Sequence, residues 1–589
     1  MGLLRPYIRK YGKPFAVAIC FLMCEALADL LLPTIMSRII DDGVANRDLD
    51  MVYRLGGLML LVTAGGALAA TMRNLIASRV SQRFGADLRR DLFRKIQSFS
   101  FPSLDKFERP SLMTRLTNDV TQIQNFVNGL MRIFVKAPLL CLGGLIMAVN
   151  LNPRLSVVLL VVVPIVALLI VLNMRVGFPL FARVQKSLDR INGTTREYLS
   201  GVRVVKAFNR YGQETEKFDS ANQEYRKRSL AAARVMSVFS PSVMLTVNFG
   251  IAAIIWLGGR RVDAGHMQVG HIIAFIQYMT QILFSLLMIS WVFNMFVRAK
   301  ASAERIGEVF AENGAMERAP ASAEETEGRA GRAGETAKIE FDRVSFAYPG
   351  GSGEPALREV SFVCRAGETV GIIGSTGSGK STLISLIPRF YDSASGTIRV
   401  DGVDVRAMDP RRLRESIAVV PQQSILFTGT IEQNIRWGKE DASVAEIEQA
   451  ARIAQAEEFI LGLPDRYEAR LGQRGVNLSG GQKQRLSIAR ALIRRPDILI
   501  LDDSTSAVDT ATESRIKEGL RKYAEGITCL IIAQRITSVI DADRIVVMDD
   551  GRVAGIGTHE ELLRGCRSYQ EIYRSQIGKE ARADVPASS

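Results

Sequence analysis

Long apolar runs dominate the first half of the 589-residue chain. Six of them have the length that crosses a bilayer as a helix, roughly 20 residues. They lie near residues 14–36, 54–76, 129–150, 155–175, 240–260 and 268–298. The last run is longer than a bilayer needs, so we expect its helix to continue beyond the membrane. The pattern predicts an all-α membrane domain with six spans.

The segments between the apolar runs set the orientation of this domain. Residues 79–115 and 175–234 are long and rich in Lys and Arg, whereas the connections at 150–154 and 258–270 are short. An excess of Lys and Arg marks the cytosolic side of a membrane. We therefore expect both long stretches, the N-terminus and everything after the sixth span in the cytosol. Apolar residues three and four positions apart predict that both stretches are helical extensions of the spans.

The composition changes near residue 315. Residues 315–337 are rich in Ala, Glu, Gly and Arg, which predicts a flexible linker. Strand-like and helix-like patterns then alternate through residues 338–577 and indicate an α/β domain. We expect a disordered tail at 578–589, so the predicted division is a membrane domain at 1–314, the linker, the α/β domain and the tail.

Composition narrows the class of protein. The chain is 47% hydrophobic and carries a formal net charge of +14, a combination that is rare in soluble proteins. A basic chain can also bind nucleic acid, but here the basic residues follow the membrane topology. We therefore expect a lipid bilayer, and no nucleic acid, as the partner. Six scattered cysteines without a CxxC pair argue against a disulfide framework or a zinc site.

The strongest chemical motif follows the apolar segment ETVGIIG and opens the helical segment KSTLISLI. Glycines let backbone N–H groups close on phosphates at the positive end of a helix. Lys380 adds a charge at the β- and γ-phosphates, and Ser381 can ligate Mg²⁺. A glycine-rich turn with a surface lysine is the alternative, but strand, motif and helix are in register for a phosphate-binding loop. The candidate nucleotide-binding residues here are Gly374, Ser375, Thr376, Gly377, Ser378, Gly379, Lys380, Ser381 and Thr382.

A second motif, residues 498–503, is an apolar strand that ends in Asp502 and Asp503. Asp502 is placed to hold Mg²⁺ through water. Many strands end in an acid, so this motif gains its value from lying downstream of a phosphate-binding loop. Together the two motifs predict ATP and Mg²⁺ as cofactors.

A third motif, the segment LSGGQ at 478–482, indicates the family. Ser479, Gly480, Gly481 and Gln482 start a helical segment and can present donors to a phosphate. A tight turn that caps the helix is the alternative for an isolated segment. Between the other two motifs, LSGGQ resembles the signature sequence of ABC ATPases, which other phosphate-loop ATPases lack.

The rest of the chain is similar to six-span ABC exporters, apart from the linker and tail. The resemblance implies that Tyr348 stacks on adenine, that Gln422 senses Mg²⁺, and that residues 506–509 form the D-loop. In the membrane half, residues 114–120 and 201–218 match the cytosolic loops of this family. It also implies coupling helices near Phe107–Ser111 and Tyr211–Lys217, the second docking on the partner chain's ATPase domain.

Two catalytic positions depart from the family pattern. Asp503 stands where the family usually has the Glu that positions water, and Gln534 stands where it has a His that touches the γ-phosphate. The shorter Asp carboxylate falls back by roughly 1.5 Å, and a misplacement of that order can cost about 10²-fold in rate. A Gln amide donates a hydrogen bond but carries no charge. One interpretation is drift within a working homodimer. We favour the other, a resemblance to the degenerate subunit of heterodimeric exporters, whose intact signature completes the site of a second half-transporter chain.

Residues that contact the transported molecule are less well defined by the pattern. Glu25 and Asp29 lie four apart in the first span, where acids usually face a cavity or a partner. Recognition of a cation is one reading, and a structural ion pair or a location at the end of the span is the other. Ordinary packing between helices is the favoured reading of a row of residues in the sixth span, and a face lining the pathway is the alternative. That row is Gln277, Gln281, Phe284, Met288, Trp291 and Met295.

We therefore expect an ATP-driven exporter subunit in a cell membrane that moves an amphipathic compound by alternating access. A lipid or peptide translocator, and an ATP-gated regulatory membrane protein with little transport, are the alternatives.

Overall fold

The computed structural model describes residues 5–312, 337–349, 353–523 and 525–577. The chain divides into two compact units, Met1–Gln97 with Glu108–Glu312, and Ser98–Phe107 with Asn313–Ser589. The expected linker at 315–337, except for its last residue, and the expected tail at 578–589 lie outside the described residues.

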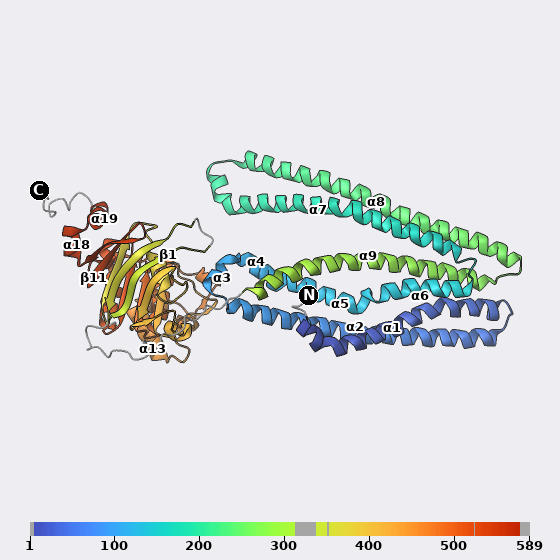
Figure 1. Cartoon of the computed structure of the whole chain (residues 1–589), viewed down its shortest axis with the longest axis horizontal. Coiled ribbons are helices and arrows are strands. Elements are labelled where there is room, and N and C mark those ends of the chain that lie inside the picture. Colours follow the sequence, from blue (N-terminus) through green and yellow to red (C-terminus); the bar gives the residue numbers. More distant parts are fainter. Residues whose placement is uncertain (1–4, 313–336, 350–352, 524, 578–589) are drawn as a thin grey trace. The chain divides into compact units, whose positions relative to one another are not determined.

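The described part of the first unit consists of helices joined by short turns (Figure 1). Its elements are α1 Arg5–Arg38, η2 Ile39–Val44, α2 Leu49–Gln97, α4 Arg109–Thr114, η3 Arg115–Asp119, α5 Val120–Gly129, η4 Leu130–Phe134, α6 Lys136–Leu151, α7 Val157–Ala207, α8 Tyr211–Asp263 and α9 Val269–Ala311. The three η segments are single π-helical turns, which widen a helix locally.

Six apolar helical segments in this unit are long enough to cross a membrane, and each overlaps one of the predicted spans, with the fourth and sixth starting two residues and one residue later than predicted. The six-span prediction is therefore confirmed. Helix α9 continues past the sixth apolar run to Ala311. Helices α2, α7 and α8 run unbroken for 49, 51 and 53 residues, so the basic stretches are helical continuations of the spans, as expected.

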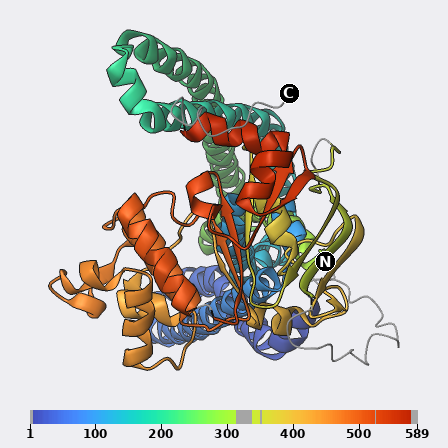
Figure 2. The ribbon, with the colours of Figure 1, turned by 90° about the vertical axis from the view of Figure 1, so that its left-hand side faces the viewer.

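Helices α7 and α8 form a long antiparallel hairpin. Figures 1 and 2 show that this hairpin diverges from the group formed by α1, α2, α5, α6 and α9. The remaining helices pack mainly as α1 on α2, α6 on α9 and α5 on α9. The third and sixth spans, which contain α6 and α9, are thus direct neighbours.

The second unit is an α/β domain, as predicted. Its strands are β1 Ala337–Phe346, β2 Leu357–Arg365, β3 Thr369–Gly374, β4 Ser395–Val400, β5 Val403–Asp404, β6 Ile417–Val420, β7 Gly429–Thr430, β8 Arg470–Leu471, β9 Ile498–Asp502, β10 Thr528–Ala533, β11 Arg544–Asp549 and β12 Arg552–Gly557. Its helices are α3 Phe101–Lys106, α10 Lys380–Leu386, α11 Pro410–Glu415, α12 Ile431–Arg436, α13 Val444–Ile453, α14 Glu457–Leu461, η5 Arg466–Glu468, η6 Gln473–Gly475, α15 Gly480–Leu492, α16 Thr510–Tyr523, α17 Ile536–Val539, α18 His559–Gly565 and α19 Arg567–Ile577.

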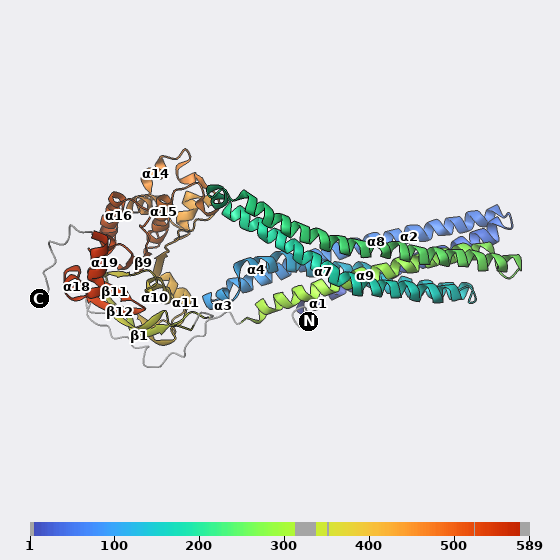
Figure 3. The ribbon, with the colours of Figure 1, turned by 90° about the horizontal axis from the view of Figure 1, so that it is seen from above.

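The central sheet has the strand order β12-β11-β3-β10-β9-β6. All neighbours are parallel except β11 and β12. An antiparallel sheet of order β2-β1-β4-β5 lies to one side of it, and the helical segment containing α14 and α15 lies on the opposite side (Figures 2 and 3). Parallel order brings the carboxyl ends of β3, β10, β9 and β6 to one edge, where α/β folds place their ligands.

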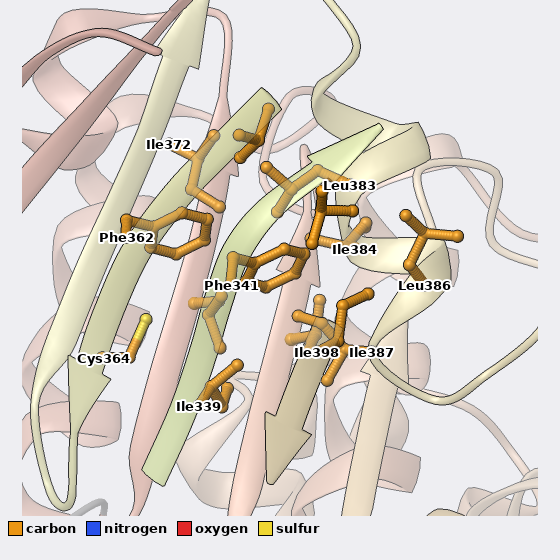
Figure 4. Packing of buried hydrophobic residues seen from close by; sticks show 14 of the residues in the cluster. Ile339, Phe341, Phe362, Cys364, Ile372, Leu383, Ile384, Leu386, Ile387 and Ile398 are labelled. Atoms are coloured by element: carbon orange, nitrogen blue, oxygen red, sulfur yellow. The ribbon is translucent and has the colours of Figure 1, made fainter. Parts of the chain in front are cut away.

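Two hydrophobic cores hold these layers together. In the first, alternate residues of β1 such as Ile339 and Phe341 face buried residues of β2, β3 and α10 (Figure 4). The rings of Phe341 and Phe362 stack with their centroids 4.7 Å apart. The second core packs α13 and α15 against the other face of β9. Because β9 is covered on both faces, all five of its residues are buried.

The stretch expected as a coupling helix, Phe107–Ser111, falls between two short helices: α3 Phe101–Lys106, which belongs to the second unit, and α4 Arg109–Thr114. Pro102 occupies the first turn of α3, where its missing N–H costs nothing, and the extended backbone of Phe107 ends this helix. The other stretch expected as a coupling helix, Tyr211–Lys217, forms the first part of α8, which no proline interrupts before Pro241.

Candidate nucleotide-binding site

The candidate site lies at the edge where four parallel strands end. The phosphate-binding loop follows β3, Gln534 follows β10, Asp502 and Asp503 end β9, and Gln422 follows β6 by two residues. Because β3, β10, β9 and β6 are consecutive neighbours, four segments far apart in sequence converge here. Thirteen residues from them and from nearby loops line a cavity of about 380 Å³.

Most of the predicted nucleotide-binding residues line this cavity. They are Tyr348, Thr376, Gly377, Gly379, Lys380, Ser381, Thr382, Gln422, Asp502, Asp503 and Gln534. Gly374, Ser375 and Ser378 bind the Lys380 ammonium, which donates to the Gly374 and Ser375 carbonyl oxygens at 2.8 and 2.7 Å and to Ser378 Oγ at 3.4 Å. Gly379 has φ +95°, and a Cβ there would lie 2.7 Å from the Ala356 carbonyl oxygen, so only glycine fits.

Lys380 and Asp502 are both buried beside each other's charge. Burial lowers the pKa of the Lys380 ammonium, against the opposing effect of the Asp502 and Asp503 carboxylates. Burial likewise raises the pKa of Asp502, and the nearby Asp503 carboxylate adds to this. For both residues, loss of solvation outweighs the attraction between their charges. A bound anion would therefore stabilise the charged form of Lys380, and a bound cation would stabilise the charged form of Asp502.

The residues fit a Mg²⁺ ion that arrives with a nucleotide. The Ser381 hydroxyl lies 3.4 Å from Asp502 Oδ1, so a hydroxyl and a carboxylate oxygen face one point. Mg²⁺ prefers oxygen ligands and is commonly held by one or two protein groups together with phosphates. Within the described residues no cluster of three His, Cys, Asp or Glu side chains could hold a metal ion, so phosphates and water would have to supply the other ligands.

The two unusual residues, Asp503 and Gln534, line the nucleotide cavity together with Gln422. Gln422 Nε2 donates to Asp503 Oδ2 at 3.3 Å. Asp503 has φ +45°, and its backbone N–H donates to the Ile532 carbonyl oxygen of β10 at 2.8 Å, which fixes where its short side chain begins.

The signature segment lies elsewhere in this chain. Ser479, Gly480, Gly481 and Gln482 are not among the described residues that line the nucleotide cavity. Ser479 caps α15, with its Oγ accepting from the Gln482 N–H at 3.3 Å while its own N–H donates to Gln482 Oε1 at 2.9 Å. The capping alternative from the sequence is thus also correct, since the turn presents the segment at a helix start.

The structure adds two connections that sequence reasoning missed. Gln484, buried on α15, donates to Ser506 Oγ at 3.1 Å and accepts from the Ala507 N–H at 3.0 Å, so it ties the signature helix to the D-loop.

Tyr391 makes the second connection. Its ring packs edge-on against Tyr348, with the ring centroids 5.4 Å apart, and its hydroxyl donates to Asp105 Oδ2 of α3 at 2.6 Å. The aromatic pair Phe390 and Tyr391 in an otherwise polar turn was the available signal.

The acids of the first span have structural partners. Glu25 Oε2 lies 2.9 Å from Arg73 Nε, and Glu25 Oε1 lies 2.5 Å from Lys136 Nζ. Lys136 Nζ also lies 2.8 Å from Asp29 Oδ2. Three spans are joined by these pairs, so the structure favours the ion-pair reading for Glu25. Asp29 additionally lines a cavity of about 530 Å³ with Gln277, Gln281, Phe284 and Met288 from α9.

Comparison with known proteins follows the same division of the chain. A family model described as the ABC transporter transmembrane region matches residues 15–286, and one described as ABC transporter matches residues 357–506. The ABC transporter ATP-binding protein YfiB of Bacillus subtilis is 42% identical over 574 residues, which cover 98% of both chains. The chain belongs to the ABC transporter family.

Other similar proteins define the type of ABC transporter. The ATP-dependent lipid A-core flippase of Syntrophus aciditrophicus is 33% identical over 575 residues, covering 97% of this chain and 93% of the flippase. A solved structure of a bacterial Atm1-family ABC exporter with ATP bound matches with a TM-score of 0.77 and 26% identity, covering 98% of this chain and all of the exporter chain. The chain is an ABC exporter of the half-transporter type, an ATP-hydrolysing, multi-pass protein of the bacterial inner membrane.

Proposed function

We propose that this ABC transporter chain is the subunit of a heterodimeric exporter that contributes a slow Walker site and an intact signature. In ABC transporters each ATP is sandwiched between one chain's phosphate-binding loop and the other chain's signature. The proposal depends on one observation: the two altered catalytic residues, Asp503 and Gln534, occur in a cavity whose other predicted nucleotide-binding residues are all of the usual type. The cargo is an amphipathic compound, and coupling follows alternating access.

The altered residues weaken hydrolysis without weakening binding. Tyr348 would stack on adenine, and its hydroxyl already lies 3.1 Å from Thr382 Oγ1 at the end of the phosphate-binding loop. Lys380 would exchange its bonds to loop carbonyls for bonds to phosphate, which supplies the anion that its buried charge lacks. Ser381 and Asp502 would hold Mg²⁺, whose chemistry is to neutralise charge that develops on the phosphates.

The positions that should activate water are the weak part of the site. Asp503 holds its carboxylate on a side chain one methylene shorter than Glu, and Gln422 occupies one of its oxygens. Gln534 can donate a hydrogen bond but brings no positive charge to the γ-phosphate. Each change removes stabilisation that matters in the transition state rather than in the bound state, so slow turnover with good ATP affinity is expected.

The signature, by contrast, is well formed. The Ser479 capping box and the Gln484 bonds to the D-loop position the start of α15 without help from another chain. A cap of this kind stabilises a helix by about 1 kcal/mol. We therefore assign this segment to the competent site, where it would close over ATP held by the partner.

Steady-state ATPase activity of the co-purified pair tests the assignment. Ser479→Arg should lower turnover about 10²-fold or more, because a bulky cation displaces the donors that close on the partner's ATP. Asp503→Asn should change turnover by less than about threefold, because its site contributes little. Equal damage by the two substitutions would show that Asp503 is a working base and would refute the degenerate assignment.

Transport assays separate the remaining readings of the function. Stimulation of the ATPase by an amphipathic compound, together with its uptake into inside-out vesicles, supports an exporter. Stimulation by lipid without uptake of soluble compounds favours a lipid translocator, a reading encouraged by similarity to a lipid A-core flippase. ATP binding that alters the membrane domain without any transport would favour a regulatory protein instead.

A further inference from the structure

A polar cavity of about 290 Å³ lies between the third and sixth spans, in the first unit. Its lining includes two arginines, Arg132 and Arg298, three side-chain amides, Gln122, Asn125 and Asn128, and the indole of Trp291. No residue of the nucleotide-binding site contributes to it. The cavity also does not include Glu25 or Asp29, the acids of the first span.

Two regular helix faces build this cavity. Asn125, Asn128 and Arg132 follow at intervals of three and four residues, as do Trp291, Met295 and Arg298 on α9. Gly129 lies between the two faces, where an added Cβ would come within 2.9 Å of the Met295 methyl group. The missing Cβ at Gly129 leaves room for the end of the Met295 side chain in the cavity wall.

The backbone around Arg132 is unusual. Arg132 lies in the π-helical turn Leu130–Phe134, and its carbonyl oxygen accepts a hydrogen bond from Arg73 Nη1 at 2.8 Å. Isolated π turns in α-helices often mark functional sites. Here the Arg73 bond holds the backbone, while the Arg132 side chain remains exposed in the cavity.

The charges inside the first three spans do not balance. The two acids, Glu25 and Asp29, are paired with Arg73 and Lys136. Arg132 lies in the third span as well, and neither it nor Arg298 has an ion-pair partner among the described residues. A charged side chain within a membrane span is costly and usually faces a cavity or a partner. The cavity is therefore lined by two cations, Arg132 and Arg298, that no acid of the described residues compensates.

The position of the cavity indicates where its occupant comes from. The third span enters from the cytosolic segment α4 and the sixth apolar run ends at Arg298, so both arginines lie at the cytosolic end of the membrane. Tryptophan favours the same boundary. The cavity lies at the lower end of the range of drug-sized pockets, about 300–1,000 Å³. Its wall carries two guanidinium groups and three amides where such pockets are mostly apolar, so it suits a polar headgroup.

We propose that this cavity binds the phosphate headgroup of an amphipathic molecule that enters from the cytosolic leaflet. Arginine guanidinium groups match phosphate geometry, and the amides add hydrogen bonds to the remaining oxygens. Trp291 and Met295 contact the first part of the apolar tail. The identification of the bound molecule as cargo rests on the proposed exporter function, whereas binding itself does not.

Binding is tested in the purified assembly in a neutral maltoside detergent, without ATP. The chain has three tryptophans, so Trp256→Phe with Trp437→Phe leaves Trp291 as its reporter. Dodecyl phosphate should change Trp291 fluorescence saturably, and dodecyltrimethylammonium should not. Arg132→Gln and Arg298→Gln should each weaken dodecyl phosphate binding about 10- to 100-fold, the loss expected for a hydrogen bond to a charged group. Arg154→Gln, an exposed arginine in the short loop after the third span, is the matched control and should bind normally.

Three results would overturn the proposal. Unchanged dodecyl phosphate binding in both arginine variants would assign the site elsewhere. Equal affinity for inorganic phosphate and dodecyl phosphate would assign the cavity to a free anion rather than to a headgroup. No Trp291 response to any phosphate compound would mean that another chain of the assembly covers the cavity. ATP plays no part in this titration. A negative titration would therefore not affect the assignment of the slow Walker site, and a negative ATPase test would not affect the assignment of the phosphate-binding cavity.

Discussion

Removal of one hydroxyl group should loosen α3 from the ATPase domain. Tyr391 donates to Asp105 of α3 at 2.6 Å, and its ring lies 5.9 Å from the ring of Phe101 on the same helix. Burial, followed by the hydrogen bond to Asp105, raises the pKa of Tyr391, so the hydroxyl stays protonated and donates at any physiological pH. Tyr391→Phe deletes the hydrogen bond but keeps the ring contacts.

The size of the effect follows from the bond that is lost. A hydrogen bond to a charged group contributes about 1.5–3 kcal/mol, and exposure of Asp105 places this one at the low end. A loss of about 1.4 kcal/mol corresponds to a tenfold change in an equilibrium. The undocked population of α3 should therefore rise about tenfold, while the contact between the tilted rings of Phe101 and Phe390, with centroids 4.5 Å apart, keeps the helix docked most of the time.

Hydrogen–deuterium exchange in the intact assembly measures this opening directly. Amides of residues 101–107 should exchange about tenfold faster in Tyr391→Phe, and Asp105→Asn should behave similarly. Tyr523→Phe is the matched control, because Tyr523 donates a bond of the same length, 2.6 Å, to the Leu492 carbonyl oxygen away from α3. An increase below about twofold, or an equal increase in the control, would refute the argument that this hydroxyl holds α3.

Three further predictions concern charged groups. Lys380→Ala should weaken ATP binding by about 10- to 100-fold, through loss of charge-assisted bonds to phosphate; equilibrium nucleotide binding measures this, and undiminished affinity would mean that the loop is misassigned. Asp502→Asn should leave the nucleotide-free protein as stable or more stable at neutral pH: burial raises the pKa of Asp502, so its ionised form costs stability above that pKa and the cost disappears below it. Thermal unfolding should show this together with loss of stabilisation by Mg²⁺–ATP, and a lower midpoint without nucleotide would contradict it. Glu25→Gln should destabilise the membrane domain by about 3–5 kcal/mol, because Arg73 is left buried without its partner. Glu224→Gln, in an exposed pair with Arg228, should cost at most about 1 kcal/mol in the same unfolding experiment.

Much of the fold could be predicted because it depends on local patterns. A run of apolar residues must find lipid or a protein core wherever it lies, so the six spans were visible without any knowledge of their neighbours. The phosphate-binding loop was equally visible, because its glycines, Lys380 and Ser381 act within one turn between a strand and a helix. The altered residues Asp503 and Gln534 could be identified for the same reason, since each directly follows a recognisable apolar strand.

The tertiary structure alone decided which of these segments meet. Tyr391 and Asp105 are 286 residues apart, and Lys136 and Glu25 are 111 apart, so neither contact leaves a periodic trace in the sequence. The same holds for Gln422 beside Asp503 and for Arg132 sharing a cavity with Arg298. The local sequence determines the charge of a side chain and the face of the helix or strand on which it lies. Its interaction partner depends on strand order and helix packing. Those arise from burial summed over the whole chain, and they determine whether a charged residue becomes an ion pair, a catalytic group or the wall of a binding site.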